Sequence, residues 1–450
     1  MRVDLDLVRK YNIAAPRYTS YPPATHFQEM KSATVLEHIR SHPSARDLSL
    51  YFHLPFCQTL CWYCGCTTVI TTQQSSSGKY IDYLKLEMDR VAPLLHPARR
   101  VAQFHFGGGT PTFLQPDEIR DLGKSIHDHF AFAEKVEAGV EIDPRRIVRD
   151  HITALREAGF NRASLGVQDF DPTVQEAVHR IQTKEETEAA VQWLREEGFT
   201  SLNIDLIYGL PHQTLDSFQK TLDDVLALQP DRFAVFNYAH VPWLKPAQKI
   251  LKVLPSPEMK LELLKMTVER LTSSGYVYIG MDHFAREGDE LSLAQKDQTL
   301  QRNFQGYSTC GQTDIYAFGM SSISQTGDAY WQNEKELPAY YASLDAGDVP
   351  VSKGYVLTED DKIRRQVIMR LMCDMSLNFA ALSQTLGVDF EKYFSTELAS
   401  LGDLEADGLL EKTLSGWMVT ELGRLLIRNI AVRFDAYFGQ QKEHRFSKSI

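Results

Sequence analysis

The sequence has few cysteines, no long apolar run and no excess of positive charge, and each absence excludes a class of protein. Only six of its 450 residues are cysteine, so it is not a small secreted scaffold held together by disulfides. No apolar stretch approaches the length that a membrane-spanning helix needs. Residues 1–7 lack the apolar core of a signal peptide, and we therefore expect a cytoplasmic protein. The formal net charge of −11 at pH 7 argues against nucleic-acid binding.

The residues that are present predict a large folded chain with more than one structural part. Hydrophobic residues make up 43% of the sequence and aromatic residues 10%, which favours an extensive core over disorder. A chain of 450 residues is also long for one domain. We expect an N-terminal arm over residues 1–35, a main α/β domain over 36–325 and a helix-rich C-terminal domain over 326–450. Prolines and several aromatic residues in the arm favour a segment that lies on the body of the protein.

Four of the six cysteines fall within ten residues, between Cys57 and Cys66. Cys57, Cys61 and Cys64 have the spacing C-x3-C-x2-C, so their thiols can reach one common point. An iron–sulfur cluster takes thiolate ligands, and three cysteines would leave one iron open for catalysis. Structural zinc usually takes two separated pairs of ligands, whereas the two remaining cysteines are single and distant. Zinc binding and a redox-sensing thiol group remain the alternatives at this point.

Short apolar strands alternate with longer amphipathic segments between residues 46 and 240. The predicted strands cover 48–53, 102–106, 139–142, 162–165, 202–207 and 232–236. Between them apolar residues recur at helical spacing, for example at Leu84, Met88 and Val91. Repeated βα units imply a parallel sheet, and six of them predict an incomplete TIM-like barrel. A doubly wound open sheet is an alternative that this pattern leaves open.

Polar residues or glycines stand where each of these strands is expected to end. They are His53, Gly107 to Gly109, Glu141, Asp143, Gln168, Asp205, Asn237 and Tyr238. In parallel α/β folds, ligands bind at the carboxyl edge of the sheet. The six strand ends therefore predict a single site at one rim.

Several motifs together resemble one enzyme family. The C-x3-C-x2-C motif is similar to the signature of the radical S-adenosylmethionine (radical SAM) enzymes, in which three cysteines hold a [4Fe–4S] cluster. A closer resemblance, over nearly the whole chain, is to the oxygen-independent coproporphyrinogen III oxidases (dehydrogenases). The residues that carry it are 11–22, 51–66, 107–112, 166–170, 203–211 and 303–307. The resemblance implies a (β/α)6 radical SAM barrel over 36–325, with residues 326–450 covering its mouth.

The resemblance also implies an activity. Members of the family decarboxylate two propionate side chains of coproporphyrinogen III to vinyl groups, which gives protoporphyrinogen IX in haem biosynthesis. A 5′-deoxyadenosyl radical removes the propionate hydrogen. The implied cofactors are one [4Fe–4S] cluster and two molecules of S-adenosylmethionine, with flavodoxin or ferredoxin as electron donor. We expect a monomer without nucleic-acid or membrane partners; a haem-binding chaperone of the same superfamily and a non-enzymatic metal module are the rival functions.

Site residues follow from the same resemblance, position by position. Cys57, Cys61 and Cys64 would ligate the cluster, whereas Cys66 receives no role. The residues expected to hold S-adenosylmethionine are Tyr51, Tyr63, Gly108, Gly109, Thr110, Glu141, Gln168, Arg180, Asp205, Ala239 and Ile323. Phe304 and Gln305 would help to hold a second molecule of it. Arg17 and Arg302 are the candidates for binding substrate carboxylates, since arginine forms bidentate pairs with them.

Overall fold

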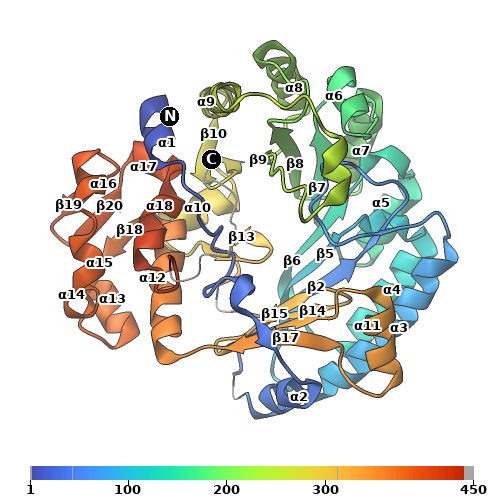
Figure 1. Cartoon of the computed structure of the whole chain (residues 1–450). Helices are drawn as coiled ribbons and strands as arrows, with labels where there is room; N and C mark the ends of the chain where they lie inside the picture. The colour runs from blue at the N-terminus through green and yellow to red at the C-terminus, as the bar shows by residue number, and fades with distance from the viewer. Residues whose placement is uncertain (1–2, 43, 312, 440–450) are drawn as a thin grey trace.

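Six parallel strands form the centre of the protein in the computed structural model, which describes residues 3–42, 44–311 and 313–439. In chain order they are β2 (Leu48–Leu54), β5 (Val101–Gly108), β6 (Phe132–Ile142), β7 (Arg162–Gln168), β8 (Ser201–Tyr208) and β9 (Arg232–Asn237). Each strand pairs in parallel with the next. Figure 1 shows them curving around a central opening. Every predicted strand lies within an observed one, so the parallel βα repeat is confirmed.

Helices follow these strands and pack on the outer side of the sheet (Figure 1). They are α3 (Ser75–Val91), α4 (Pro116–His129), α5 (Arg149–Glu157), α6 (Pro172–Ala177), α7 (Lys184–Glu196), α8 (Leu215–Ala227) and α9 (Pro257–Ser273). The local sequence explains where they begin. The hydroxyl of Ser256 caps α9 by accepting from the Met259 N–H at 3.2 Å. Leu84 and Met88 on α3 are fully buried, as their helical spacing predicts.

Further strands extend the sheet at both edges, to 13 strands among the described residues. On one side lie β14 (Asp314–Phe318), β15 (Ile323–Gln325), β16 (Ala329–Asn333), β17 (Val351–Val356) and β1 (Gln28–Glu29). On the other lie β11 (His283–Arg286) and β10 (Tyr276–Gly280). β14 is parallel to β2, and the remaining edge pairs are antiparallel. The predicted boundary at 325/326 falls inside this sheet, and the division into domains stays a prediction.

The C-terminal region adds a second, mostly helical core. Its elements are α12 (Glu359–Asp374), α13 (Phe379–Leu386), α14 (Phe390–Tyr393), α15 (Ser395–Ala399), α16 (Gly402–Ala406), α17 (Glu421–Leu425) and α18 (Ile427–Ala431), with β18 (Ser376–Asn378), β19 (Leu410–Thr413) and β20 (Gly416–Val419). Tyr11, Tyr18 and Tyr21 of the N-terminal arm are buried in this core. The Tyr18 hydroxyl donates to Asp435 at 2.9 Å, so the arm is packed and hydrogen-bonded at this end of the molecule.

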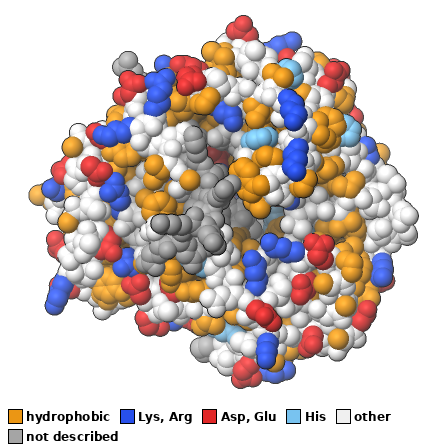
Figure 2. All heavy atoms as spheres, viewed as in Figure 1, with side chains coloured by type: hydrophobic (Ala, Val, Ile, Leu, Met, Phe, Trp, Pro, Cys, Tyr) orange, Lys and Arg blue, Asp and Glu red, His pale blue; other side chains and the backbone are white. Residues whose placement is uncertain are grey.

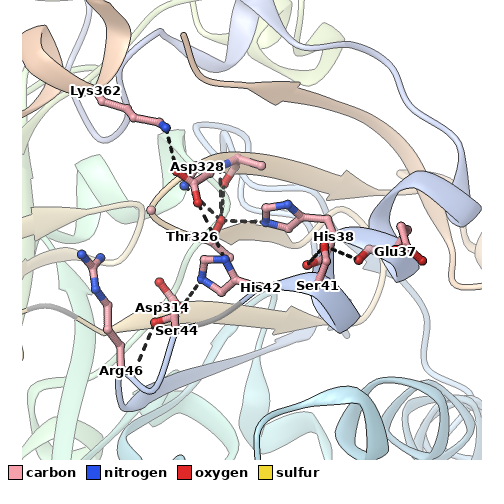
Figure 3. Close-up of polar contacts among 12 residues, drawn as sticks. Glu37, His38, Ser41, His42, Ser44, Arg46, Asp314, Thr326, Asp328 and Lys362 are labelled. Atoms are coloured by element: carbon pink, nitrogen blue, oxygen red, sulfur yellow. Dashed lines mark hydrogen bonds and ion pairs between the residues drawn. The ribbon is translucent and has the colours of Figure 1, made fainter. Parts of the chain in front are cut away.

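Another junction joins the segment after α2, the sheet and the C-terminal region (Figure 3). His42, which follows α2 (Ser32–Ser41), has its Nε2 3.2 Å from the Asp314 carboxylate on β14. Lys362 on α12 forms an ion pair with Asp328 at 2.9 Å, and His42 lies 3.7 Å from the same carboxylate. These contacts fix the edge of the barrel to α12. No helix in the described part of the chain has the length and apolar content needed to cross a membrane.

Candidate active site

The cysteine motif lies on the loop between β2 and α3, at the carboxyl end of the parallel strands. Two short strands, β3 (Phe56–Cys57) and β4 (Val69–Ile70), pair in parallel and bring the two ends of this loop together. All four cysteines of the motif line one cavity of about 560 Å³. Cys61 is buried, Cys57 and Cys64 are half-buried, and Cys66 is exposed. The loop therefore presents closely spaced thiols to a single space, as the spacing predicts.

Two guanidinium groups contact the sulfur of Cys61. Arg145 Nη2 and Arg180 Nη1 donate to its Sγ at 3.7 and 3.6 Å. Asp143, just after β6, holds both arginines at 2.6 and 3.2 Å. Burial raises the pKa of Asp143, but Arg180 and Arg145 outweigh burial and bring this pKa down to about 2. The two guanidinium groups thus place positive charge beside one sulfur of the motif.

The glycine run at the end of β5 packs closely against the cysteine loop. Gly108 has a φ of +113°, and a Cβ on Gly109 would lie only 2.4 Å from the Pro55 carbonyl oxygen. The hydroxyl of Thr110 lies 3.3 Å from the sulfur of Cys57. A side chain at Gly109 would therefore push the two loops apart, which explains why this position needs glycine.

Glu141, Gln168, Arg180 and Asp205 line the same cavity from three strand ends and the loop after α6. Glu141 accepts from the Gly108 N–H at 3.0 Å. Burial raises the pKa of Glu141, but His105 and the Gly108 N–H lower it more, and the net shift is downward. Burial raises the pKa of Asp205 to about 7, although its carboxylate accepts from Ser164. The cavity thus holds two carboxyls kept ionised, Glu141 and Asp143, and one, Asp205, with a pKa near neutral pH.

Three other expected contacts lie around this cavity. Tyr63 lines it. Gln248 donates to the carbonyls of Tyr63 and Ala239 at 3.0 and 3.3 Å, which ties Ala239 to the cysteine loop. Tyr51 on β2 stacks on His105, with ring centroids 5.9 Å apart. Neither Tyr51 nor Ala239 is among the residues that line the 560 Å³ cavity.

A second cavity of about 240 Å³ lies deeper in the barrel and shares Glu141, Ser164, Asp205 and Phe236 with the first. Gln305 lines it, in the turn between β12 (Gln301–Asn303) and β13 (Gly306–Ser308). The Gln305 Nε2 atom is buried without a hydrogen-bond partner among the described residues. A ligand in the barrel would satisfy this donor.

Phe304 and Ile323 lie elsewhere. They pack in the apolar cluster around Tyr330, with the Phe304 ring edge-on to Tyr330 at 6.0 Å. Neither residue lines the two barrel cavities. The structure therefore brings Gln305 to the site but places its neighbour Phe304 against the sheet edge.

The two candidate substrate arginines differ in how they are paired. Arg17 forms an ion pair with Asp282. Arg302 is 6% exposed, and its guanidinium lies 4.8 Å from the Tyr307 ring centroid. Its Nη2 donates to the Arg17 carbonyl at 3.3 Å, whereas Nε and Nη1 have no partner in the described part of the chain. A buried cation with two unused donors fits a carboxylate ligand.

Arg302 also lines a third cavity of about 890 Å³ beside the β12–β13 hairpin and α12. Arg46, Arg365 and Arg370 line it too, against one carboxylate, Asp374. Sequence reasoning singled out neither this cavity nor Arg145, which follows β6 and contacts the Cys61 sulfur. Arg145 had a usable signal, because it stands two residues after the strand-end Asp143.

The donor atoms at the first cavity fit the expected cluster and S-adenosylmethionine. No three His, Cys, Asp or Glu side chains converge closely enough to hold a single metal ion, within the residues described. Three thiols spread along one loop, with guanidinium groups at one sulfur, suit a larger group ligated by thiolates. Gly108 and Gly109 let this part of the chain approach His53 and Pro55 closely, which holds the cysteine loop at the cavity.

Comparison with known proteins agrees with this geometry. Residues 51–225 match the family described as "Radical SAM superfamily", and residues 357–426 match "HemN C-terminal domain". The oxygen-independent coproporphyrinogen III oxidase of Salmonella typhimurium is 48% identical over 451 residues, covering 99% of this chain and 98% of that protein. The protein of the same name from Pseudomonas aeruginosa is 46% identical, covering 100% and 99%.

A solved structure extends the agreement to three dimensions. It is coproporphyrinogen III oxidase (HemN) from Escherichia coli, described as a radical SAM enzyme. The two structures superpose with a TM-score of 0.92 at 46% identity, over 97% of this chain and 99% of the other. This chain belongs to the oxygen-independent coproporphyrinogen III oxidase family of the radical SAM superfamily.

Proposed function

We propose that this chain is an oxygen-independent coproporphyrinogen III oxidase, which converts two propionate side chains of coproporphyrinogen III to vinyl groups in haem biosynthesis. The observation that carries the proposal is similarity over the full length to enzymes of that name. The site supports it, because the cysteine loop, the glycine run and the polar strand ends meet at one cavity. No observation favours the haem-binding chaperone or the non-enzymatic metal module.

In this proposal Cys57, Cys61 and Cys64 hold the [4Fe–4S] cluster, and Cys66 stays outside the ligand set. Bound together, the cluster and S-adenosylmethionine supply reductive cleavage of the sulfonium and removal of a hydrogen atom from a propionate. Arg145 and Arg180 place positive charge at the Cys61 sulfur.

The residues proposed to hold S-adenosylmethionine are Tyr51, Tyr63, Gly108, Gly109, Thr110, Glu141, Gln168, Arg180, Asp205, Ala239 and Ile323. All except Ile323 line the first cavity or lie beside it. Glu141, kept ionised beside the glycine run, suits the ammonium group in the amino-acid part of the molecule. Ile323 has the weakest support, since it packs at the sheet edge.

Binding of a second S-adenosylmethionine and of the substrate is proposed deeper in the barrel. Gln305 offers an unused buried amide donor, and Phe304 would contribute only if it left its place beside Tyr330. Arg302 has two buried donors for a substrate carboxylate, and Arg17 would have to share its guanidinium with Asp282. Burial, followed by the charge of Arg302, lowers the pKa of His283 to about 3, so its imidazole stays neutral beside the substrate.

The electron donor, the oligomeric state and the compartment are also proposed. The cluster needs an electron donor such as flavodoxin or ferredoxin, and we expect the enzyme to work as a monomer. A reducing compartment, such as the cytoplasm, suits six cysteines that form no disulfide.

The experiment that tests the function is anaerobic turnover. The cluster is reconstituted, and dithionite, S-adenosylmethionine and coproporphyrinogen III are added. The porphyrins are then oxidised and separated by chromatography. We expect protoporphyrin together with 5′-deoxyadenosine. 5′-Deoxyadenosine without protoporphyrin would refute the substrate, and neither product from a fully loaded enzyme would refute the activity.

A further inference from the structure

An exposed surface lies beside the cysteine loop and takes no part in holding the thiols. It is formed by residues 243–253, between β9 and α9, and we call it the 243–253 surface. Its exposed apolar side chains are Trp243, Leu244, Ile250 and Val253, with 54%, 66%, 52% and 57% of their area accessible. Figure 1 shows this yellow-green segment at the mouth of the barrel. Four large apolar side chains within eleven residues are typical of an interaction site rather than of ordinary surface.

This surface is basic in an acidic protein. Residues 239–257 contain three lysines and no Asp or Glu, whereas the whole chain has a net charge of −11. Lys249 and Lys252 are exposed, and neither forms an ion pair with another described residue. Figure 2 shows basic and apolar side chains side by side along this rim of the central hollow. Apolar contacts surrounded by charge of one sign favour a protein partner of the opposite sign.

Two hydrogen bonds attach the surface to the cysteine loop. Lys245 Nζ donates to the Cys66 carbonyl at 2.6 Å, and Gln248 Nε2 donates to the Tyr63 carbonyl at 3.0 Å. Gln248 is 1% exposed, so its bond is shielded from water. These two attachment points stand on either side of Cys64. A protein docked on the 243–253 surface would therefore lie beside the loop that carries the cluster ligands.

We propose that the 243–253 surface is the docking site for the reductant of the cluster, a small acidic electron-carrier protein that contains a flavin or an iron–sulfur group. This inference rests on the proposed function, because that reaction needs a reduced cluster. In the step concerned, one electron passes from the reduced carrier to the cluster. The carrier is oxidised by one electron and the cluster is reduced by one, and no bond forms or breaks.

The binding test compares two variants with a control. Lys249→Glu/Lys252→Glu reverses the charge, and Leu244→Ser/Ile250→Ser removes apolar area, while Lys245 and Gln248 stay intact. The control, Lys135→Glu/Lys392→Glu, makes the same change of charge at exposed lysines elsewhere. Titration calorimetry on the reconstituted full chain uses an acidic flavodoxin and, separately, an acidic [2Fe–2S] ferredoxin. The two carriers distinguish a flavin from an iron–sulfur donor.

We expect the charge variant to bind one or both carriers roughly tenfold more weakly at low salt, with the difference shrinking at high salt, because salt screens exposed charges. The apolar variant should bind more weakly at both salt concentrations. The control should match the wild type. Unchanged affinity in both variants, or no binding of either carrier to the wild type, would overturn the proposal. The proposal would also be overturned if the two variants lost the binding of the wild type to anionic lipid vesicles but kept the wild-type affinity for the carriers.

Turnover supplies a second readout that separates docking from catalysis. With dithionite, which needs no docking site, both variants should form protoporphyrin at the wild-type rate; with a reduced carrier they should be slower. Loss of the dithionite-driven rate would overturn the inference, since the segment would then be part of the active site. Absence of protoporphyrin from the wild type with dithionite would refute the proposed function but leave the binding result to decide the docking site.

Discussion

Single residues decide the charge of the site, and Arg180 illustrates how. Its guanidinium contacts the Cys61 sulfur, the Asp143 carboxylate at 3.2 Å and the Gly166 carbonyl at 2.5 Å. An arginine can serve three acceptors at once because its donors form a fixed planar fork, which lysine lacks. The loop after α6 is thereby held against the cysteine loop, and one cation is kept at the sulfur.

Glu87 on α3 provides a prediction at the same scale. It is 3% exposed and accepts from the Gly319 N–H at 2.8 Å and from Tyr340 and Asn333 at 2.7 Å each. Burial raises its pKa to about 7 despite these bonds. Because the folded pKa lies above the unfolded one, Glu87 contributes stability that is present below pH 4.5 and lost as the pH rises through 7.

Glu87→Gln removes this titration. Between pH 5 and pH 8 the free energy of unfolding of the variant, relative to the wild type, should therefore rise by about 2 kcal/mol. Urea denaturation at the two pH values measures it. The control is Glu134→Gln at an exposed position. Its free energy of unfolding, relative to the wild type, should be the same at pH 5 and pH 8. A difference for Glu87→Gln that does not change with pH would contradict the prediction.

At the scale of elements, the barrel strands were predictable because local sequence encodes them. β2, β5 and β8 are largely apolar stretches with polar residues or glycines in their second halves, and this pattern needs no knowledge of the rest of the chain. β15, β16 and β17 were not predicted. They are short or carry polar and aromatic residues on both faces, and their partners lie across the sheet edge.

The loop after β5 yields a prediction about two elements in contact. In Gly109→Ala the new Cβ would stand 2.4 Å from the Pro55 carbonyl oxygen, and backbone must move to make room. We expect at least a tenfold loss of turnover and a lower content of iron and sulfide, since a misplaced loop costs orientation at the site. Iron and sulfide assays together with anaerobic turnover measure both.

Gly78→Ala is the matched control. Gly78 lies in α3, and a Cβ there would meet only the Glu118 carboxylate, at 3.7 Å. Alanine in a helix interior stabilises by about 1 kcal/mol relative to glycine, so this variant should keep its cluster and melt at a higher temperature. Full iron content and activity in Gly109→Ala would show that the close approach does not matter.

At the scale of the whole molecule, the first and last parts of the chain form one core. The Tyr18 hydroxyl is buried and donates to Asp435, and Arg428 Nε donates to the Pro16 carbonyl at 3.1 Å. This arrangement joins the arm, which carries Arg17, to the C-terminal helices. The arm and the C-terminal region should therefore lose their structure together.

Tyr18→Phe tests this coupling. It leaves the buried Asp435 carboxylate without one donor, and we expect a loss of about 2 kcal/mol in stability, because hydrogen bonds to charged groups are worth roughly 1.5–3 kcal/mol. Limited proteolysis should then cut the arm and the C-terminal helices at similar rates. Tyr393→Phe is the control, since Tyr393 donates to Asp360 at an exposed position. Faster cleavage of the arm alone would contradict the coupling.

The sequence by itself determined the cysteine loop, the glycine run and the six-strand repeat, because spacing and periodicity within a few residues are local properties. It also led to Glu141, Gln168 and Asp205, since parallel strands deliver their ends to one rim, whereas Arg180 followed from the family resemblance. Only the tertiary structure decided that Gln305 reaches the barrel cavity whereas Phe304 and Ile323 pack at the sheet edge. It also decided that Arg17 pairs with a carboxylate, whereas Arg302 has two guanidinium donors without a partner among the described residues. Those outcomes depend on how separate elements pack against one another, which no local pattern encodes.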